Sequence, residues 1–168
     1  MMYYSHVKNT GYRFCVGIML INSQKKVFVG KRINKISFIK ESISNEGWQM
    51  PQGGIDQGET PVQALFRELK EEIGCDKATL IAESQNWYTY ELPNILRSDL
   101  KKNQFHSIKQ KWFLMSFIGN DEEINIANHY QPEFSEWKWV SIDQLKDLII
   151  FFKKEVYEKV VQEFKIHF

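Results

Sequence analysis

Three glutamates crowd the short stretch RELKEEIG, in which Glu68, Glu71 and Glu72 fall within five residues. On a helix, like charges three or four residues apart repel one another by roughly 0.2–0.5 kcal/mol per pair. The stretch also lies in the C-terminal half of a predicted helix, where the helix dipole disfavours negative charge. Two local energies oppose this arrangement, so either a solvated acidic face or a bound hard cation has to account for it.

The helix that carries these glutamates is predicted over Thr60–Ile73. Thr60 can cap its start, Pro61 suits the first helical position, and Gly74 suits the stop. At about 100° per residue, its apolar side chains form one stripe that we expect to pack on a sheet, with the carboxylates on a separate face beside it. The members of this stripe are Val62, Leu65, Phe66, Leu69 and Ile73.

Apolar and alternating segments on both sides of this helix predict a mixed sheet. Strands are expected at Arg13–Ile21, Val27–Lys31, Trp48–Met50, Ala78–Leu92, Lys111–Ile118 and Glu136–Val140, and loops at 33–47, Pro51–Glu59 and 93–107. A short helix is expected from Ser141, which forms a capping-box pattern with Gln144, and a last helix over Phe152–Phe164. Strands interspersed with helices predict an α/β fold, as one domain over residues 1–168.

Composition excludes several classes of protein. Hydrophobic residues make up 43% of the 168 residues, enough for a core and against disorder. The net charge of +1 argues against a protein that coats long nucleic acid, so any nucleic-acid contact is expected to be local, and no DNA partner is expected. The longest apolar runs, Phe14–Ile21 and Leu148–Phe152, are far short of the ~20 residues that span a bilayer. With no signal peptide in sight, a cytoplasmic protein without a membrane partner is expected.

The glycine-rich loop before the helix decides between the acidic face and the cation site. From Gly53, the sequence GGIDQGETPVQALFRELKEEIGC resembles the Nudix box. That pattern is Gly, five residues, Glu, seven residues, then Arg-Glu-apolar-any-Glu-Glu-any-Gly-apolar. The matching positions are Gly53, Glu59, Arg67, Glu68, Leu69, Glu71, Glu72 and Gly74, and Cys75 departs mildly from the final aliphatic position.

Membership of the Nudix family implies hydrolysis of a nucleoside diphosphate linked to another group, with a divalent metal. It implies an α/β/α sandwich with a mixed sheet, in which residues 53–75 form a loop–helix–loop. The resemblance assigns the metal to Glu68, Glu71, Glu72 and the Gly53 carbonyl, and structural roles to Glu59, Arg67 and Gly74. Mg²⁺ is the expected ion, with Mn²⁺ or Zn²⁺ as alternatives.

Segments outside the box resemble one subfamily, the bacterial RNA pyrophosphohydrolases, which are related to dinucleoside polyphosphate hydrolases. The matching segments include GYR, WQMPQGGID, NWYTYELP, KQKWFLM, EINI, PEFSEWKWV and FKKEVYEKV. The resemblance implies removal of pyrophosphate from the 5′ end of triphosphorylated RNA, a step that triggers mRNA decay. Two alternatives stay open, a hydrolase of diadenosine polyphosphates and a Nudix-like module that binds nucleotides without cleaving them. A monomer is expected.

The subfamily resemblance also implies roles for residues outside the box. Glu123 is expected as a fourth carboxylate at the metal and as the second candidate, after Glu68, for the general base. The residues expected to bind the substrate are Arg13, Arg32 and Lys153 at phosphates, Gln49 and Tyr90 along the site, and Phe152 as a ring that stacks on a base. Two departures from the subfamily are an insertion at 35–46 and the pair Ser107-Ile108, which leaves the roles of Lys109 and Lys111 open.

Overall fold

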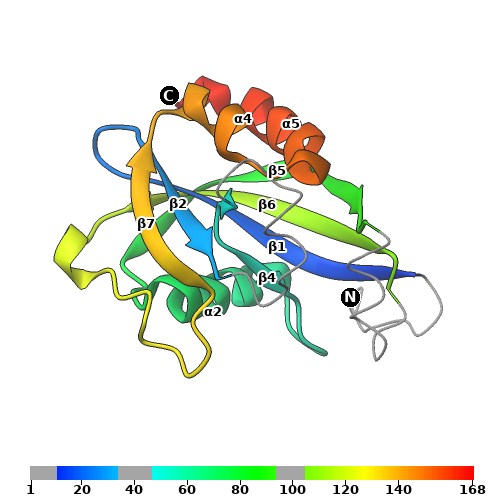
Figure 1. The fold of residues 1–168 in the computed structure, drawn as a ribbon, viewed down its shortest axis with the longest axis horizontal. Coiled ribbons are helices and arrows are strands. Elements are labelled where there is room, and N and C mark those ends of the chain that lie inside the picture. The colour runs from blue at the N-terminus through cyan, green and yellow to red at the C-terminus, as the bar shows by residue number, and fades with distance from the viewer. Residues whose placement is uncertain (1–10, 34–46, 94–104) are drawn as a thin grey trace.

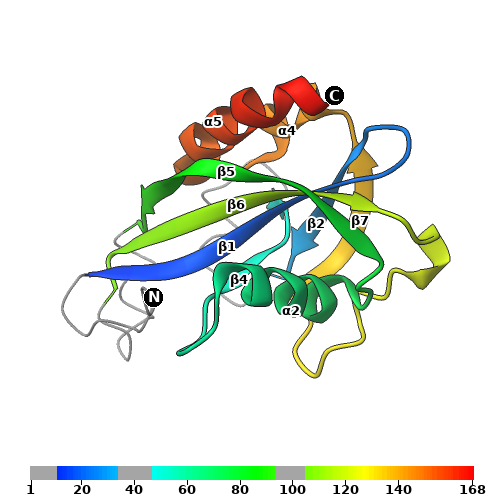
Figure 2. The ribbon, with the colours of Figure 1, turned by 180° about the vertical axis from the view of Figure 1, so that it is seen from behind.

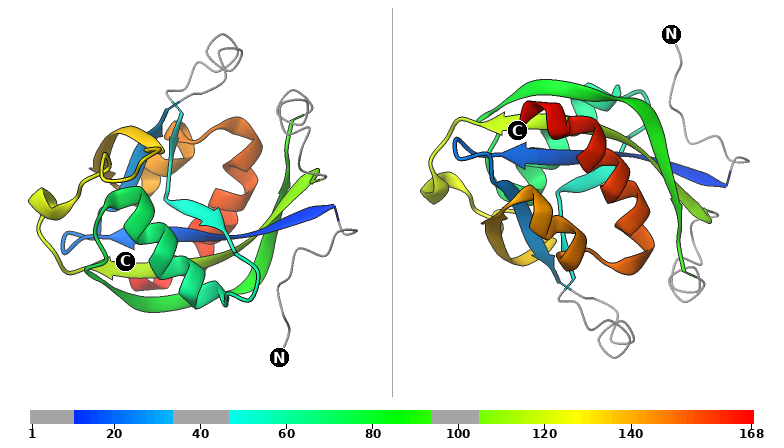
Figure 3. Two further views of the ribbon diagram at one scale, coloured as in Figure 1. Left: turned by 90° about the horizontal axis from the view of Figure 1, so that it is seen from below. Right: turned by 90° about the horizontal axis from the view of Figure 1, so that it is seen from above.

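A sheet lies between two helical layers in the computed structural model, which describes residues 11–33, 47–93 and 105–168. Helix α2 (Pro61–Ile73) covers one face, and α4 (Leu145–Leu148) and α5 (Lys154–Phe164) cover the other (Figure 1). Figure 2 shows the same layers from behind, and the views from below and above place α2 and α5 on opposite sides of the strands (Figure 3). The predicted α/β/α sandwich is confirmed.

The long strand β1 (Tyr12–Ile21) organises the sheet. It runs parallel to β6 (Ser107–Phe117) over its whole length, and antiparallel to β2 (Val27–Arg32) and β4 (Gln52–Gly54). The other strands are β3 (Trp48–Gln49), β5 (Ala78–Glu91) and β7 (Phe134–Val140). Among the described residues the order is β3-β2-β1-β6-β5, with β7 paired to β2, so the sheet is mixed as predicted.

Apolar cores fill the space on both faces of the sheet because successive side chains of a strand point to opposite sides. On β1, Val16, Ile18 and Leu20 belong to the core under α2, whereas Met19 and Ile21 belong to the core under α5. Because β1 is buried on both faces, its sequence is a continuous apolar run rather than an alternating one.

The ends of α2 follow the sequence prediction. The Gln63 N–H donates to the Thr60 hydroxyl at 3.2 Å, and the Gln63 side chain accepts from the Thr60 N–H at 2.8 Å. Gly74 ends the helix at φ 70°, a left-handed conformation that glycine adopts without strain. The predicted capping pattern at Ser141 is also present, since its N–H donates to Gln144 Oε1 at 2.9 Å.

The buried face of α2 differs from the predicted apolar stripe. Val62 and Phe66 are 39% and 37% exposed, whereas Glu72 is only 5% exposed. Glu72 therefore lies within the buried face, beside Leu65, and not on a separate carboxylate face. The prediction grouped Glu72 with the other carboxylates because a glutamate is rarely buried without a partner, and its partner, described below, lies on another segment.

Several element boundaries were wrong. The predicted loop Pro51–Glu59 contains β4, whose Gly53 and Gly54 pair with β1. Strand β6 begins at Ser107, before the predicted Lys111, because its polar start pairs with the start of β1. A 3₁₀ turn, η3 (Phe151–Lys153), precedes the last helix, which begins at Lys154 rather than Phe152.

The insertion at 35–46 and most of the predicted loop at 93–107 lie outside the described residues. The other 3₁₀ turns are η1 (Asp121–Glu123), η2 (Ile142–Gln144) and η4 (Lys165–His167). Among the residues that the structure describes, the helices are too short or too polar to cross a bilayer.

Replacement of Gly17 tests the packing of β1. A Cβ atom at Gly17 would lie 2.5 Å from two ring carbons of the fully buried Trp112. We expect Gly17→Ala to lower the free energy of unfolding by about 1–3 kcal/mol through overpacking. Urea unfolding measures this. The double variant Gly17→Ala/Trp112→Leu should lose less than the sum of the single variants, and a Gly17→Ala protein as stable as wild type would contradict the packing described here.

Candidate functional site

The Arg67 guanidinium joins the glycine loop to the helix. Its Nε and Nη2 donate to the two carboxylate oxygens of Glu59 at 2.9 and 2.7 Å, and Nη2 also donates to the Gly54 carbonyl at 2.7 Å. Its Nη1 donates to Glu68 at 2.8 Å and to Glu71 at 3.3 Å. The bonds with Glu59 raise the pKa of Arg67 and lower the pKa of Glu59. One cation thus ties three carboxylates and the loop backbone together.

Two consecutive glycines allow side chains to approach the backbone of β4 closely. A Cβ atom at Gly53 would lie 1.9 Å from the Glu68 carboxyl carbon, and one at Gly54 would lie 2.6 Å from Arg13 Nη2. Because neighbouring positions of a strand face opposite sides, Glu68 and Arg13 approach from opposite faces. A larger residue at either position would push the Glu68 carboxylate or the Arg13 guanidinium aside.

Glu72 carries a buried carboxyl group at the centre of this region. Its Oε2 accepts the Gln52 N–H at 3.0 Å. Burial raises the pKa of Glu72 well above its usual value, and the negative charge of Glu68 adds to the rise. Burial likewise raises the pKa of Glu68, although the bond to Arg67 opposes this. Burial therefore disfavours the ionised forms of both carboxyl groups, and a cation beside them would favour those forms.

The donor chemistry fits a hard divalent cation, which prefers carboxylate and carbonyl oxygens. Glu68, Glu71, Glu72 and the Gly53 carbonyl could supply them. In the part of the chain that the structure describes, no group of three acidic, histidine or cysteine side chains is arranged so that it could hold a metal ion. The Glu68 and Glu71 carboxylates instead turn toward Arg67, at 2.8 and 3.3 Å.

Glu123 has different hydrogen-bond partners from these carboxylates. It forms an ion pair with Lys77, and its Oε2 accepts the Asn120 N–H at 2.9 Å. The bond with Lys77 lowers the pKa of Glu123. Among the described residues, Glu123 thus bonds Asn120 of its own turn and Lys77, and its role at the metal stays a prediction.

A second group of predicted residues meets at the start of α5. Lys153 Nζ donates to Gln49 Oε1 at 2.8 Å and lies 5.7 Å from the centroid of the Tyr90 ring. Lys153 is 2% exposed, and its burial lowers the pKa of the ammonium to about 7, with the positive charge of Arg32 as the next cause. Phe152 packs on Tyr90 with the ring centroids 5.9 Å apart. The structure therefore brings together Gln49, Tyr90, Phe152 and Lys153.

The remaining predicted residues lie nearer the surface. Arg13 is exposed beside Gly54, and Arg32 is half exposed, with its Nε 3.7 Å from Glu133 Oε2.

The two neighbouring rings Phe151 and Phe152 differ in exposure. Phe151 is 70% exposed while Phe152 is partly buried, so the more accessible ring of this pair is Phe151. The stacking role of Phe152 stays a prediction.

Sequence reasoning missed three residues that hold the site. Gln52 binds Glu72 through its N–H, and its Oε1 accepts from Gln110 Nε2 at 3.0 Å. The hydroxyl of Tyr157 accepts the Met50 N–H at 2.9 Å. Gln52 lies within the matched segment WQMPQGGID, which is the one signal that could have found it. Gln110 and Tyr157 carry no local signal, because their partners lie 58 and 107 residues away.

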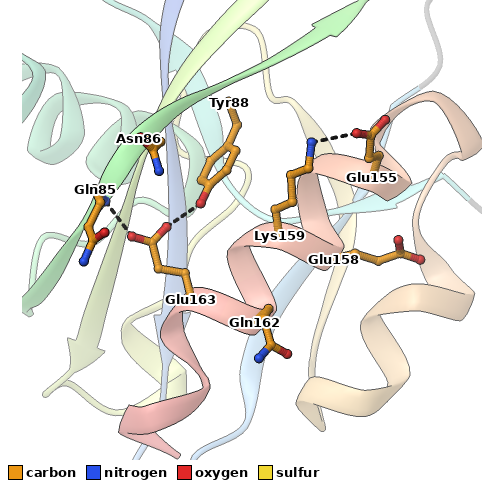
Figure 4. Close-up of a pocket in the computed structure, with 8 residues that line it drawn as sticks. All are labelled: Gln85, Asn86, Tyr88, Glu155, Glu158, Lys159, Gln162 and Glu163. Atoms are coloured by element: carbon orange, nitrogen blue, oxygen red, sulfur yellow. Dashed lines mark hydrogen bonds and ion pairs between the residues drawn. The ribbon is translucent and has the colours of Figure 1, made fainter.

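A hollow between β5 and α5 is a separate feature (Figure 4). Several of its polar groups bind one another. Glu163 accepts from the Gln85 N–H and from the Tyr88 hydroxyl, and Lys159 pairs with Glu155 at 2.6 Å. None of the residues lining this hollow belongs to the box or to the predicted substrate contacts.

Comparison with known proteins agrees with this geometry. The model of the NUDIX domain family matches residues 11–160, so the chain belongs to the Nudix family. A protein of Orientia tsutsugamushi (strain Boryong) named RNA pyrophosphohydrolase is 48% identical over 158 residues, covering 94% of this chain and 92% of the relative. One of Rickettsia rickettsii (strain Sheila Smith), with the same name, is 50% identical over 155 residues, covering 92% and 90%. Both resemblances drawn from the sequence are confirmed.

Solved structures show the same fold at low identity. The MutT protein from Methanosarcina mazei Go1 aligns with a TM-score of 0.64 at 16% identity, covering 92% of this chain and 96% of that one. The C. elegans Ap4A hydrolase aligns with a TM-score of 0.59 at 14% identity, covering 93% and 98%. At such identities the likeness extends to the fold alone.

The buried Lys153 predicts a pH dependence of stability. An unfolded lysine titrates near 10.4, whereas Lys153 titrates at about 7 in the fold. Between these values the unfolded chain binds more protons, so Lys153 makes the free energy of unfolding rise as pH increases from about 7 to about 10. Lys153→Met should lose this contribution, and Lys154→Met, at the exposed neighbouring position, should keep it. Chemical unfolding at several pH values measures the difference, and equal pH slopes in wild type and Lys153→Met would contradict it.

Proposed function

We propose that this chain hydrolyses the 5′ end of triphosphorylated RNA, releasing pyrophosphate and leaving a 5′-monophosphate that exposes the transcript to decay. The main support is the identity of 48–50% with RNA pyrophosphohydrolases over more than nine-tenths of the chain, together with an intact set of box carboxylates. We further propose that it acts as a monomer in the cytoplasm.

We propose that Glu68, Glu71, Glu72 and the Gly53 carbonyl hold a divalent ion, with Mg²⁺ preferred and Mn²⁺ or Zn²⁺ as alternatives. When bound, such an ion neutralises phosphate oxygens and lowers the pKa of the attacking water. The close grouping of Glu68, Glu72 and the backbone of Gln52 and Gly53 supports this assignment. So does the burial that raises the pKa of both carboxyl groups, because a cation beside them would favour their ionised forms. Glu123 joins the set once it parts from Lys77.

Glu68 is the proposed general base. It accepts a proton from the water that attacks phosphorus, and the bond between the remaining phosphate and the pyrophosphate group breaks. Its partial burial raises its pKa, which makes the carboxylate a better proton acceptor. The approach to Gly53 and the bond to Arg67 hold the carboxylate in place. Glu123 is the second candidate.

We assign the substrate phosphates to Arg13, Arg32 and Lys153, with Gln49 and Tyr90 along the site. Phosphate charge near Lys153 favours its ammonium form, against the desolvation that lowers its pKa. Phe152, on the Tyr90 ring, is the proposed stacking surface for a base.

The choice of substrate is tested by comparing kcat/KM on a short triphosphorylated RNA, on Ap4A and on common dNTPs with Mg²⁺. We expect the RNA to be preferred. A wide margin in favour of Ap4A would overturn the RNA assignment in favour of a dinucleoside polyphosphate hydrolase. Failure to release phosphate from any nucleotide, with Mg²⁺ or Mn²⁺, would instead indicate a binding module.

The role of Glu68 is tested by Glu68→Gln, which keeps an oxygen for the bond to Arg67 but cannot accept the proton. We expect kcat to fall by roughly 10²–10⁴-fold with the melting temperature nearly unchanged. The matched control is Glu158→Gln on the exposed side of α5, which should leave kcat as in wild type. Near-normal turnover by Glu68→Gln would transfer the role of base to Glu123.

A further inference from the structure

The segment Gln49–Gly54 (QMPQGG) runs from the end of β3 through β4 and supplies the backbone that meets the carboxylates. Each of its residues has a partner outside the segment. At its beginning, Gln49 binds Lys153, and the Met50 N–H donates to Tyr157. In its middle, the Pro51 carbonyl accepts from the Ile18 N–H, and Gln52 binds Glu72 and Gln110. At its end, Gly53 lies against Glu68, and the Gly54 carbonyl accepts from Arg67. The position of this segment is therefore set by several elements at once.

Two of these partners come from the start of the last helix. Lys153 and Tyr157 are four residues apart, so they face the same side of the helix and reach the consecutive residues Gln49 and Met50. Helix α5 covers the face of the sheet opposite α2 (Figure 1). The segment is thus held by α5 at its beginning and by α2 at its end.

The bond between Tyr157 and Met50 is fully enclosed. Met50 is 0% exposed and Tyr157 is 2% exposed. The Tyr157 ring packs edge-on against Trp112, with centroids 5.3 Å apart and an angle of 77° between the rings, so the hydroxyl has little freedom to move. A buried N–H that loses its acceptor has no water to replace it, and the backbone has to shift to satisfy it.

A shift of Met50 would reach the carboxylates directly. Two residues later the Gln52 N–H binds Glu72 at 3.0 Å, and the next residue, Gly53, has no Cβ and lies against Glu68. We propose that Tyr157 is a positioning residue of the metal site, which acts through the Met50 N–H on the backbone of Gln52 and Gly53. This inference rests on the metal site proposed above. Residues that orient metal ligands from the second layer commonly change metal affinity or activity by 10–100-fold when replaced.

The test replaces Tyr157 with Phe, which keeps the ring against Trp112 and removes the hydroxyl. Binding of Mn²⁺ alone is measured by isothermal titration calorimetry without RNA. We expect the Kd for Mn²⁺ to rise about tenfold. Turnover of triphosphorylated RNA should fall at low metal concentration and recover as metal is added, with KM for RNA unchanged.

Tyr88→Phe is the matched control. The Tyr88 hydroxyl also binds α5, through Glu163 at 2.6 Å, but it bonds no residue of the QMPQGG segment (Figure 4). This variant should lose stability without losing Mn²⁺ affinity. An unchanged Mn²⁺ affinity in Tyr157→Phe overturns the proposal, and so does an equal loss in both variants, because that would reflect a loosened helix.

Hydrogen exchange of the wild-type protein gives a second measurement if Tyr157→Phe does not fold. Added Mg²⁺ should slow exchange of the Met50 amide and leave the Gln85 amide unaffected, and no change at Met50 overturns the proposal. Wild-type protein that binds no Mn²⁺ would refute the metal site itself. A loss of Mn²⁺ affinity in Tyr157→Phe, together with a wild-type protein that is inactive on triphosphorylated RNA, would refute the substrate assignment alone.

Discussion

The hydrogen bonds of the Arg67 guanidinium are the interactions on which the candidate site depends. It lies among Glu59, Glu68, Glu71 and the Gly54 carbonyl, and bonds all four. Without a planar cation that presents several donors in fixed directions, the carboxylates would repel one another and the loop would lose its anchor to the helix. Because Arg67 is placed by α2 and the loop is placed by β1, this contact also fixes how the helix sits on the sheet.

The candidate site draws on all three layers of the fold. The sheet contributes β4 and the proposed phosphate contact Arg13 on β1, α2 contributes the glutamates, and η3 and α5 contribute Lys153 and Tyr157. The C-terminal helical layer therefore contacts the candidate site as well as covering the core. Lys153 and Tyr157 bind the beginning of the QMPQGG segment, and the end of the same segment meets Glu68 and Glu72.

Burial shifts the pKa values of the two enclosed ionisable groups, Glu72 and Lys153, in opposite directions. It raises the pKa of Glu72 and lowers the pKa of Lys153, so both groups are pushed toward their neutral forms. The same two groups belong to the proposed metal and phosphate contacts, where a divalent ion beside Glu72 and a phosphate beside Lys153 would each favour the charged form.

The sequence by itself determined the box, the ends of its helix, the positions of the main strands along the chain and the family, because these depend on local spacing. Gly53, Glu59, Arg67 and the glutamates all lie within 20 residues of one another. Only the tertiary structure decided that Glu72 is buried, that QMPQGG contains a strand, and that Tyr157 holds Met50 from 107 residues away. Those outcomes depend on hydrogen bonds between distant segments, and helical or strand periodicity carries no information about such partners.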